Sequence, residues 1–173
     1  VILGNIVEQG PDSLRTLRHI MELSENNQVY TVLGDRDTIC KELLRNDRND
    51  ELLKYVLSKK NGLIWDMCEA SNIPLKSNTN MFLVKQSLRV LYEREIAFIC
   101  ALPHIVETER FVFAHAQILP GNPENMKPTD VIRCEAFLDK GFSFERYVVV
   151  GHWPVMLYDQ EKRDANPIIN TSR

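Results

Sequence analysis

The sequence predicts an α/β fold with a partly parallel sheet, because short apolar runs alternate along the chain with segments of helical periodicity. The apolar runs, rich in β-branched and aromatic side chains as buried strands are, occupy residues 1–3, 29–33, 111–114 and 147–150. Apolar residues at helical spacing occur over residues 14–21, 38–44, 51–57 and 81–100. Strands that alternate with helices in this way are expected to form a sheet with helices packed over its faces.

The first helix has a clear start signal, because Asp12 and Ser13 offer an N-cap just before the apolar face that begins at Leu14. Residues 49–102 are mostly helical in pattern and contain no strand followed by a glycine turn, so we expect a helical insertion or cap there. The chain shows no internal repeat and no low-complexity tract. We therefore expect residues 1–173 to form one domain.

The charge and hydropathy of the chain exclude several classes of function. With 24 acidic and 21 basic side chains, the formal charge is -3, so no basic surface predicts binding to nucleic acid or to an anionic membrane. The longest apolar stretch, residues 96–102, is far shorter than a membrane span, and the N-terminus lacks the pattern of a signal peptide. The four cysteines include no CxxC pair, which favours reduced thiols. We expect a cytoplasmic protein.

Polar side chains follow four of the predicted strands. Asn5, Asp35, His115 and His152 each come one or two residues after an apolar run. In α/β sheets, ligands collect outside the carboxyl ends of the strands, so these side chains are expected to converge. Nitrogen and oxygen donors without a thiolate suit Mn, Fe or Zn. Each residue alone has a plainer interpretation, as a hydrogen-bonded histidine or a simple turn residue.

The motifs at these strand ends resemble a known family. Residues 4–13 read Gly-Asn-Ile-Val-Glu-Gln-Gly-Pro-Asp-Ser, residues 32–37 read Val-Leu-Gly-Asp-Arg-Asp, and residues 151–155 read Gly-His-Trp-Pro-Val. They resemble the Gly-Asp-x-Val-Asp-Arg-Gly-Pro-Asp-Ser, Gly-Asn-His-Asp/Glu and Gly-His-Thr-Pro-Val motifs of the calcineurin-like metallophosphoesterases, in particular the bacterial serine/threonine phosphoprotein phosphatases. The resemblance implies a metallophosphoesterase-type β-sandwich flanked by helices, with residues 49–102 as a helical insertion.

The resemblance also implies an activity, hydrolysis of phosphomonoesters by metal-activated water, and a phosphorylated protein or small phosphoester as substrate. The family carries two metal ions. Asn5 stands at the position of the bridging ligand, and Asp35, His115 and His152 stand at ligand positions of the second metal. The first metal is held in the family by an Asp-x-His motif on an upstream strand that this chain does not contain, so we expect a longer protein.

The sequence departs from the family at the metal-bridging position. The carboxamide of Asn5 offers one good oxygen and no charge, whereas two dications need a bridging carboxylate. Asp35, where the family has Asn, restores one carboxylate to the cluster. We therefore expect one metal held by Asp35, His115, His152 and Asn5, or none, in place of two.

The remaining departures concern proton transfer and phosphate binding. Arg36 and Glu8 stand where the family has its catalytic His-Asp pair, and an arginine cannot cycle a proton. Gln9 replaces the arginine that clamps phosphate, and Arg36 is a candidate to replace that clamp. Trp153 is a candidate to line the substrate cleft, with simple packing as the alternative.

Three interpretations follow from these departures. The chain is an active phosphomonoesterase, either a protein phosphatase or a dinucleoside tetraphosphatase. Alternatively, it is a degenerate family member that binds phosphate or a phosphoprotein without turnover. The third alternative is an altered or truncated piece of such a fold with an empty site.

Overall fold

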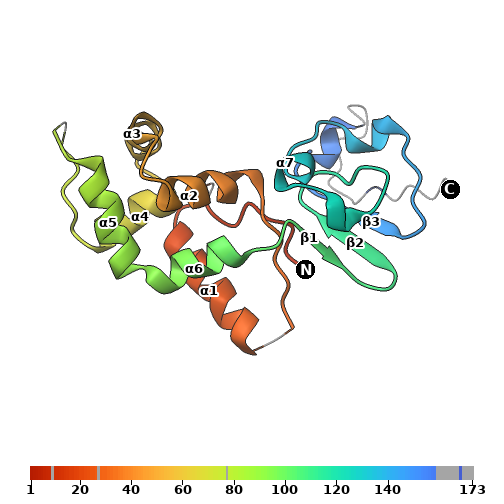
Figure 1. The fold of residues 1–173 in the computed structure, drawn as a ribbon, viewed down its shortest axis with the longest axis horizontal. Helices are drawn as coiled ribbons and strands as arrows, with labels where there is room; N and C mark the ends of the chain where they lie inside the picture. The colour runs from red at the N-terminus through yellow and green to blue at the C-terminus, as the bar shows by residue number, and fades with distance from the viewer. Residues whose placement is uncertain (9, 27, 77, 159–167, 169–173) are drawn as a thin grey trace. The chain divides into compact units, whose positions relative to one another are not determined.

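A computed structural model describes residues 1–173 of the chain except residues 9, 27, 77, 159–167 and 169–173 (Figure 1). The chain divides into two compact units. The first, which we call the sheet unit, comprises Val1–Gly4, Tyr30–Asp35 and Pro103–Arg173. The second, the helical unit, comprises Asn5–Val29 and Arg36–Leu102. That residues 1–173 form a single domain with an insertion stays a prediction.

The sheet unit contains a small three-stranded sheet in the order β1-β2-β3, with β1 antiparallel and β3 parallel to the central strand. The strands are β1 (Ile105–Glu107), β2 (Phe111–Ala114) and β3 (Tyr147–Val149). The short helices of this unit are η1 (Pro123–Asn125), α7 (Pro128–Val131), η2 (Phe137–Lys140) and η3 (Val155–Leu157). The predicted strands at 111–114 and 147–150 are confirmed.

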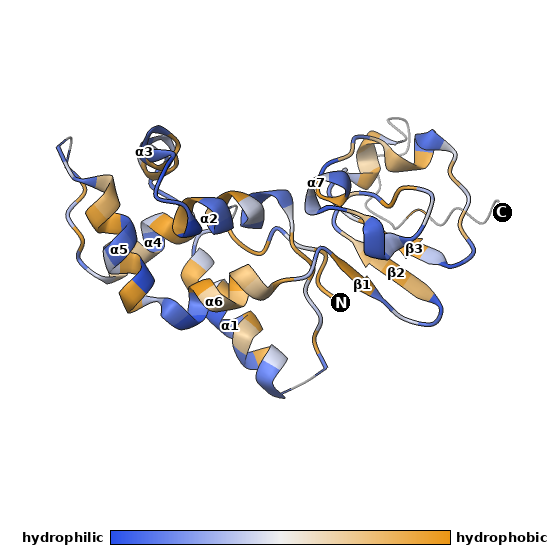
Figure 2. Cartoon of the chain, in the orientation of Figure 1, coloured by the Kyte–Doolittle hydropathy of each residue, from blue (hydrophilic) through white to orange (hydrophobic). Residues whose placement is uncertain are grey.

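The core of the sheet unit lies on one face of β2. Side chains alternate along a strand, so Val112 and Ala114 point to the same face, and both are buried. They pack with apolar residues from the segments that follow β2, namely Ile118, Met126, Val131 and Ile132. The central strand is accordingly among the apolar, orange segments in Figure 2.

The predicted strands at residues 1–3 and 29–33 form only an isolated parallel bridge, between Ile2 and Thr31. Two backbone hydrogen bonds hold it, from Ile2 N–H to the Tyr30 carbonyl and from Val32 N–H to the Ile2 carbonyl, at 2.8 and 2.9 Å. Gly4 takes a φ of +83° directly afterwards, so the extended segment ends too early to form a ladder.

The predicted β-sandwich is therefore wrong. The described residues hold seven α-helices and one three-stranded sheet, a small α/β fold rich in helix. A sandwich needs two packed sheets, and the apolar runs at 1–3 and 29–33 meet only at the isolated Ile2–Thr31 bridge, so the described residues form no second sheet. The local sequence pattern predicted the strands β2 and β3 correctly. It does not contain information on which strands pair, or on how many strands form one sheet.

The helical unit is built from amphipathic helices whose ribbons show both apolar and polar residues in Figure 2. Their bounds are α1 (Ser13–Asn26), α2 (Asp35–Arg45), α3 (Asp50–Ser58), α4 (Leu63–Ala70), α5 (Met81–Leu91) and α6 (Glu93–Ala101). The helix α1 starts as predicted, with the Asp12 carboxylate accepting from Arg15 N–H at 3.0 Å and Leu14, Leu17 and Ile20 buried. All of α2 after its first residue belongs to this unit.

The helix predicted over residues 81–100 is two helices, because the chain breaks at Tyr92 between α5 and α6 (Figure 1). The Tyr92 hydroxyl lies 2.6 Å from the Ser71 hydroxyl and donates to the Met67 carbonyl at 3.0 Å, so the break is fixed to α4. Across the part of the chain that is described, none of the helices combines the length and the apolar composition needed to cross a bilayer.

Candidate metal centre

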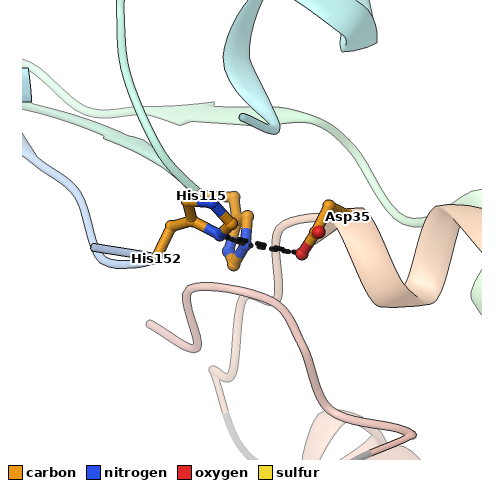
Figure 3. Close-up of side chains that lie close together, drawn as sticks. All are labelled: Asp35, His115 and His152. Atoms are coloured by element: carbon orange, nitrogen blue, oxygen red, sulfur yellow. Dashed lines mark hydrogen bonds and ion pairs between the residues drawn. The ribbon is translucent and has the colours of Figure 1, made fainter. Parts of the chain in front are cut away.

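Three of the side chains predicted to converge do lie together in the sheet unit: Asp35, His115 and His152 (Figure 3). Asp35 is the first residue of α2, and His115 directly follows β2. His152 follows β3 after a glycine turn. Asp35 and His115 are almost fully buried, while 22% of the His152 side chain is exposed. The cluster is therefore open to solvent on the side of His152.

The three donor atoms form a nearly equilateral triangle. His115 Nε2 lies 3.1 Å from His152 Nδ1 and 3.4 Å from Asp35 Oδ1, and His152 Nδ1 lies 3.7 Å from the same Asp35 oxygen. Ligand atoms bound tetrahedrally at about 2.1 Å from one ion lie roughly 3.4 Å apart. The triangle thus has the size that one divalent ion requires, before any side chain moves.

A backbone hydrogen bond sets the tautomer of His115. Its Nδ1 lies 2.5 Å from the Leu3 carbonyl oxygen, and a carbonyl can only accept, so Nδ1 carries the proton. In the neutral ring, Nε2 then presents its lone pair to Asp35 and His152. Metal-binding histidines are commonly oriented by such a bond from the other ring nitrogen.

The backbone around the cluster is tight and strained. A Cβ at Gly4 would meet Gly34 N at 2.6 Å and His115 Nδ1 at 3.1 Å, so only glycine permits this approach. His152 has a φ of +63°, a conformation that costs a non-glycine residue about 1–2 kcal/mol. Strain of this kind is typical of ligand-binding positions.

An arginine that the sequence did not single out also lies at the cluster. Arg133 Nε is 3.5 Å from Asp35 Oδ2, and 71% of the Arg133 side chain is exposed. The segment before it is fixed by the N–H groups of Ala116 and Gln117, which both donate to the Val131 carbonyl. Because this pairing is tertiary, nothing in the local sequence distinguishes Arg133 from the other arginines.

Asn5 and Arg36 lie in the helical unit. Asn5 Oδ1 accepts from the Arg36 backbone N–H at 3.0 Å, and Asn5 has a φ of +54°. The Arg36 residue is exposed, and in the described ranges its guanidinium forms no ion pair. Their roles as metal ligand and as phosphate or catalytic residue stay predictions.

The carboxylate of Glu8, predicted to assist catalysis, is engaged within the helical unit. Its Oε1 accepts from Leu63 N–H at 2.9 Å, at the start of α4, and from the Cys40 thiol at 3.0 Å. Burial, followed by the nearby Glu8 charge, raises the pKa of Cys40 well above its usual value. Gln9, the predicted phosphate residue, lies outside the described residues.

Trp153, predicted to line a substrate cleft, is partly buried. Its indole Nε1 is buried, and no hydrogen-bond acceptor for it is found among the described residues. Its backbone N–H donates to the Gly151 carbonyl at 2.8 Å, which forms the turn that carries His152. The position of Trp153 is therefore tied to that of a cluster residue.

Compared with known proteins, the chain gives no match to a protein-family model, to a curated protein or to a solved structure.

Proposed function

We propose that this chain is a metal-dependent phosphoesterase that acts on phosphomonoesters of a protein or a small molecule. One observation carries the proposal: the donor atoms of Asp35, His115 and His152 lie 3.1 to 3.7 Å apart, as one ion requires. The resemblance of residues 4–13, 32–37 and 151–155 to metallophosphoesterase motifs supports the choice of reaction.

The donor set suits Mn, Fe or Zn, because it offers one carboxylate and two imidazoles and no thiolate. Asp35, His115 and His152 would hold the ion, with the tautomer of His115 fixed by the Leu3 carbonyl. When bound, such an ion polarises a phosphoryl oxygen and activates water.

Arg133 would bind the phosphate. Its guanidinium is mostly exposed and yet lies 3.5 Å from Asp35, so a cationic group stands at the edge of the cluster. Arginine matches the planar spacing of two phosphate oxygens and keeps its charge at any working pH. Substrate bound there would be oriented beside His152, the most exposed member of the cluster.

A second candidate function is a phosphate-binding module without turnover. The observation that favours it is the engagement of the Glu8 carboxylate by Leu63 N–H and the Cys40 thiol. Together with Arg36, which cannot cycle a proton, this leaves the predicted proton-transfer pair without a working acid or base. General acid catalysis typically contributes about 10²–10⁴-fold to rate, so its loss would leave binding as the main activity.

Hydrolysis of p-nitrophenyl phosphate with Mn²⁺ tests the proposal. We expect turnover by the wild-type chain and a loss of about 100-fold or more in the His115→Ala and His152→Ala double variant. His19→Ala is the control, because that side chain is 67% exposed on α1 and outside the cluster. It should leave the rate unchanged.

Binding of Mn²⁺ and inorganic phosphate, measured by calorimetry, separates the two candidates. Metal and phosphate binding that depends on His115 and Arg133, without turnover, would favour the binding module. If the wild-type chain bound neither metal nor phosphate, both candidates would be wrong.

A further inference from the structure

The loop that follows Gly4 is held by one buried carboxylate. Asp37, which is fully buried, accepts from the backbone N–H groups of Asn5, Ile6 and Val7 at 2.8, 3.0 and 3.3 Å. A buried carboxylate needs such donors, because burial without them is costly. Asp37 therefore fixes the backbone of three consecutive residues.

The side chain of Asn5 forms a hydrogen bond with the first turn of α2. The first N–H groups of a helix have no partner within the helix, and Asn5 Oδ1 accepts the one of Arg36 at 3.0 Å. Asn5 therefore makes two bonds to the first turn of α2: its side chain accepts from Arg36 N–H, and its own N–H donates to the Asp37 carboxylate. We call this pair the Asn5–Asp37 clasp. Both residues belong to the helical unit.

The clasp lies directly beside a proposed metal ligand along the chain. The Arg36 N–H belongs to the peptide group formed with Asp35, so the bond from Asn5 fixes the plane of that peptide. Asp37 sits two residues beyond Asp35 in the same helical turn. Because Asn5 and Asp37 both hold this turn, the direction of the Asp35 Cα–Cβ bond is set by the backbone.

We propose that the Asn5–Asp37 clasp positions Asp35 for metal binding, and that Asn5 acts as a helix cap in place of a metal ligand. This inference rests on the proposed function of the Asp35, His115 and His152 cluster. It accounts for a carboxamide at position 5: Asn tolerates a φ of +54° and accepts from an N–H without adding a charge. Residues that orient a ligand typically change metal affinity by about 10–100-fold.

A Co²⁺ titration followed by visible absorption tests the inference. The variants are Asn5→Gly, which suits the positive φ and removes only the side chain, Asp37→Asn, and the two combined. We expect each single variant to weaken Co²⁺ binding about 10-fold, and the double variant to be little worse than either, since both disrupt one unit. Asn5→Asp keeps an acceptor for Arg36 N–H, so we expect this variant to bind Co²⁺ at least as tightly as the wild-type chain does.

Asn80→Gly is the matched control. Its side chain caps α5 by accepting from Phe82 and Leu83 N–H groups, so its loss removes the same kind of cap from another helix of the helical unit. We expect a comparable loss of stability and unchanged Co²⁺ affinity. Equal losses of affinity in Asn80→Gly and Asn5→Gly would overturn the inference, because the effect would then be general destabilisation.

Hydrogen exchange at the Arg36 amide separates a cap from a ligand. A cap keeps this amide protected when Co²⁺ is bound, whereas an Asn5 oxygen that moved to the metal would release it. Release on metal binding, or wild-type affinity in Asn5→Gly, would overturn the inference while the proposed function stood. A wild-type chain that bound no Co²⁺, with Asp35→Ala as the reference, would overturn both.

Discussion

Two acidic side chains of the helical unit and one of the sheet unit have different kinds of partner. In the helical unit, Asp37 and Glu8 accept from backbone N–H groups and hold loops to the starts of helices. In the sheet unit, Asp35 faces the ring nitrogens of His115 and His152. The role of a carboxylate in a motif therefore depends on the groups that surround it in the fold. Backbone donors make Asp37 and Glu8 structural acceptors, whereas the imidazole nitrogens near Asp35 are the basis for proposing it as a metal ligand.

The largest expected effect comes from adding a side chain at Gly4, which lies very close to Gly34 and His115. Gly4→Ala puts a Cβ 2.6 Å from Gly34 N and 3.1 Å from His115 Nδ1, at a positive φ. We expect urea denaturation to show a loss of about 2–4 kcal/mol in the free energy of unfolding, with weaker Co²⁺ binding. Gly141→Ala, with a φ of +66° and open space around it, should lose only about 1–2 kcal/mol and keep its metal affinity. If Gly4→Ala and Gly141→Ala lost the same free energy of unfolding, the close approach of Gly4 to Gly34 and His115 would not contribute to the effect.

A smaller loss should follow from removing a structural carboxylate. Glu8→Ala deprives Leu63 N–H of its acceptor at the start of α4, which typically costs about 1–2 kcal/mol. Co²⁺ affinity should stay within about twofold of wild type, since Glu8 is not a ligand in our proposal. Glu69→Ala on the exposed side of the same helix should change stability by less than about 0.5 kcal/mol. A large loss of Co²⁺ affinity in Glu8→Ala would break the comparison between the units.

The buried thiol beside Glu8 predicts a loss of stability at high pH. Burial first, and then the Glu8 charge, raises the pKa of Cys40 above its usual 9.0, so the folded state holds that proton more tightly than the unfolded state. The resulting stability is complete below pH 9.0 and falls above it, by at most about 1.4 kcal/mol per pH unit for each such group.

Urea denaturation between pH 8 and 10 measures this slope. Cys40→Ala should make the decline shallower but not remove it, because burial also raises the pKa of Cys68, to about 11. If the wild-type protein and Cys40→Ala lost stability equally over this range, the pKa of the Cys40 thiol would not be raised in the folded state.

The smallest effect should come from an indole without an acceptor. Trp153 Nε1 is buried with no partner in the described ranges, so Trp153→Phe removes a polar group whose burial is unfavourable. We expect a thermal unfolding change equivalent to less than about 1 kcal/mol. Tyr92→Phe, which removes a hydroxyl bonded to Met67 and Ser71, should lose about 1–1.5 kcal/mol. A greater loss in Trp153→Phe than in Tyr92→Phe would contradict this expectation.

Much of the local structure was predictable from pattern. The N-cap at Asp12, the strands β2 and β3 and the helical character of residues 50–58 follow from capping and periodicity, which are properties of neighbouring residues. The break at Tyr92 was not predictable, because its hydroxyl bonds α4, a helix distant in sequence. The absence of a sandwich was missed for the same reason, since strand pairing is decided between segments.

The order of polar residues after apolar runs is enough to identify Asn5, Asp35, His115 and His152 as candidate ligands. Only the tertiary structure decided that the donor atoms of the last three of these residues lie 3.1 to 3.7 Å apart, and that Arg133 lies beside them. It also gave the Glu8 carboxylate its structural partners. The physical reason is that helix and strand formation depends on near neighbours, whereas ligand geometry depends on contacts between residues far apart in the chain.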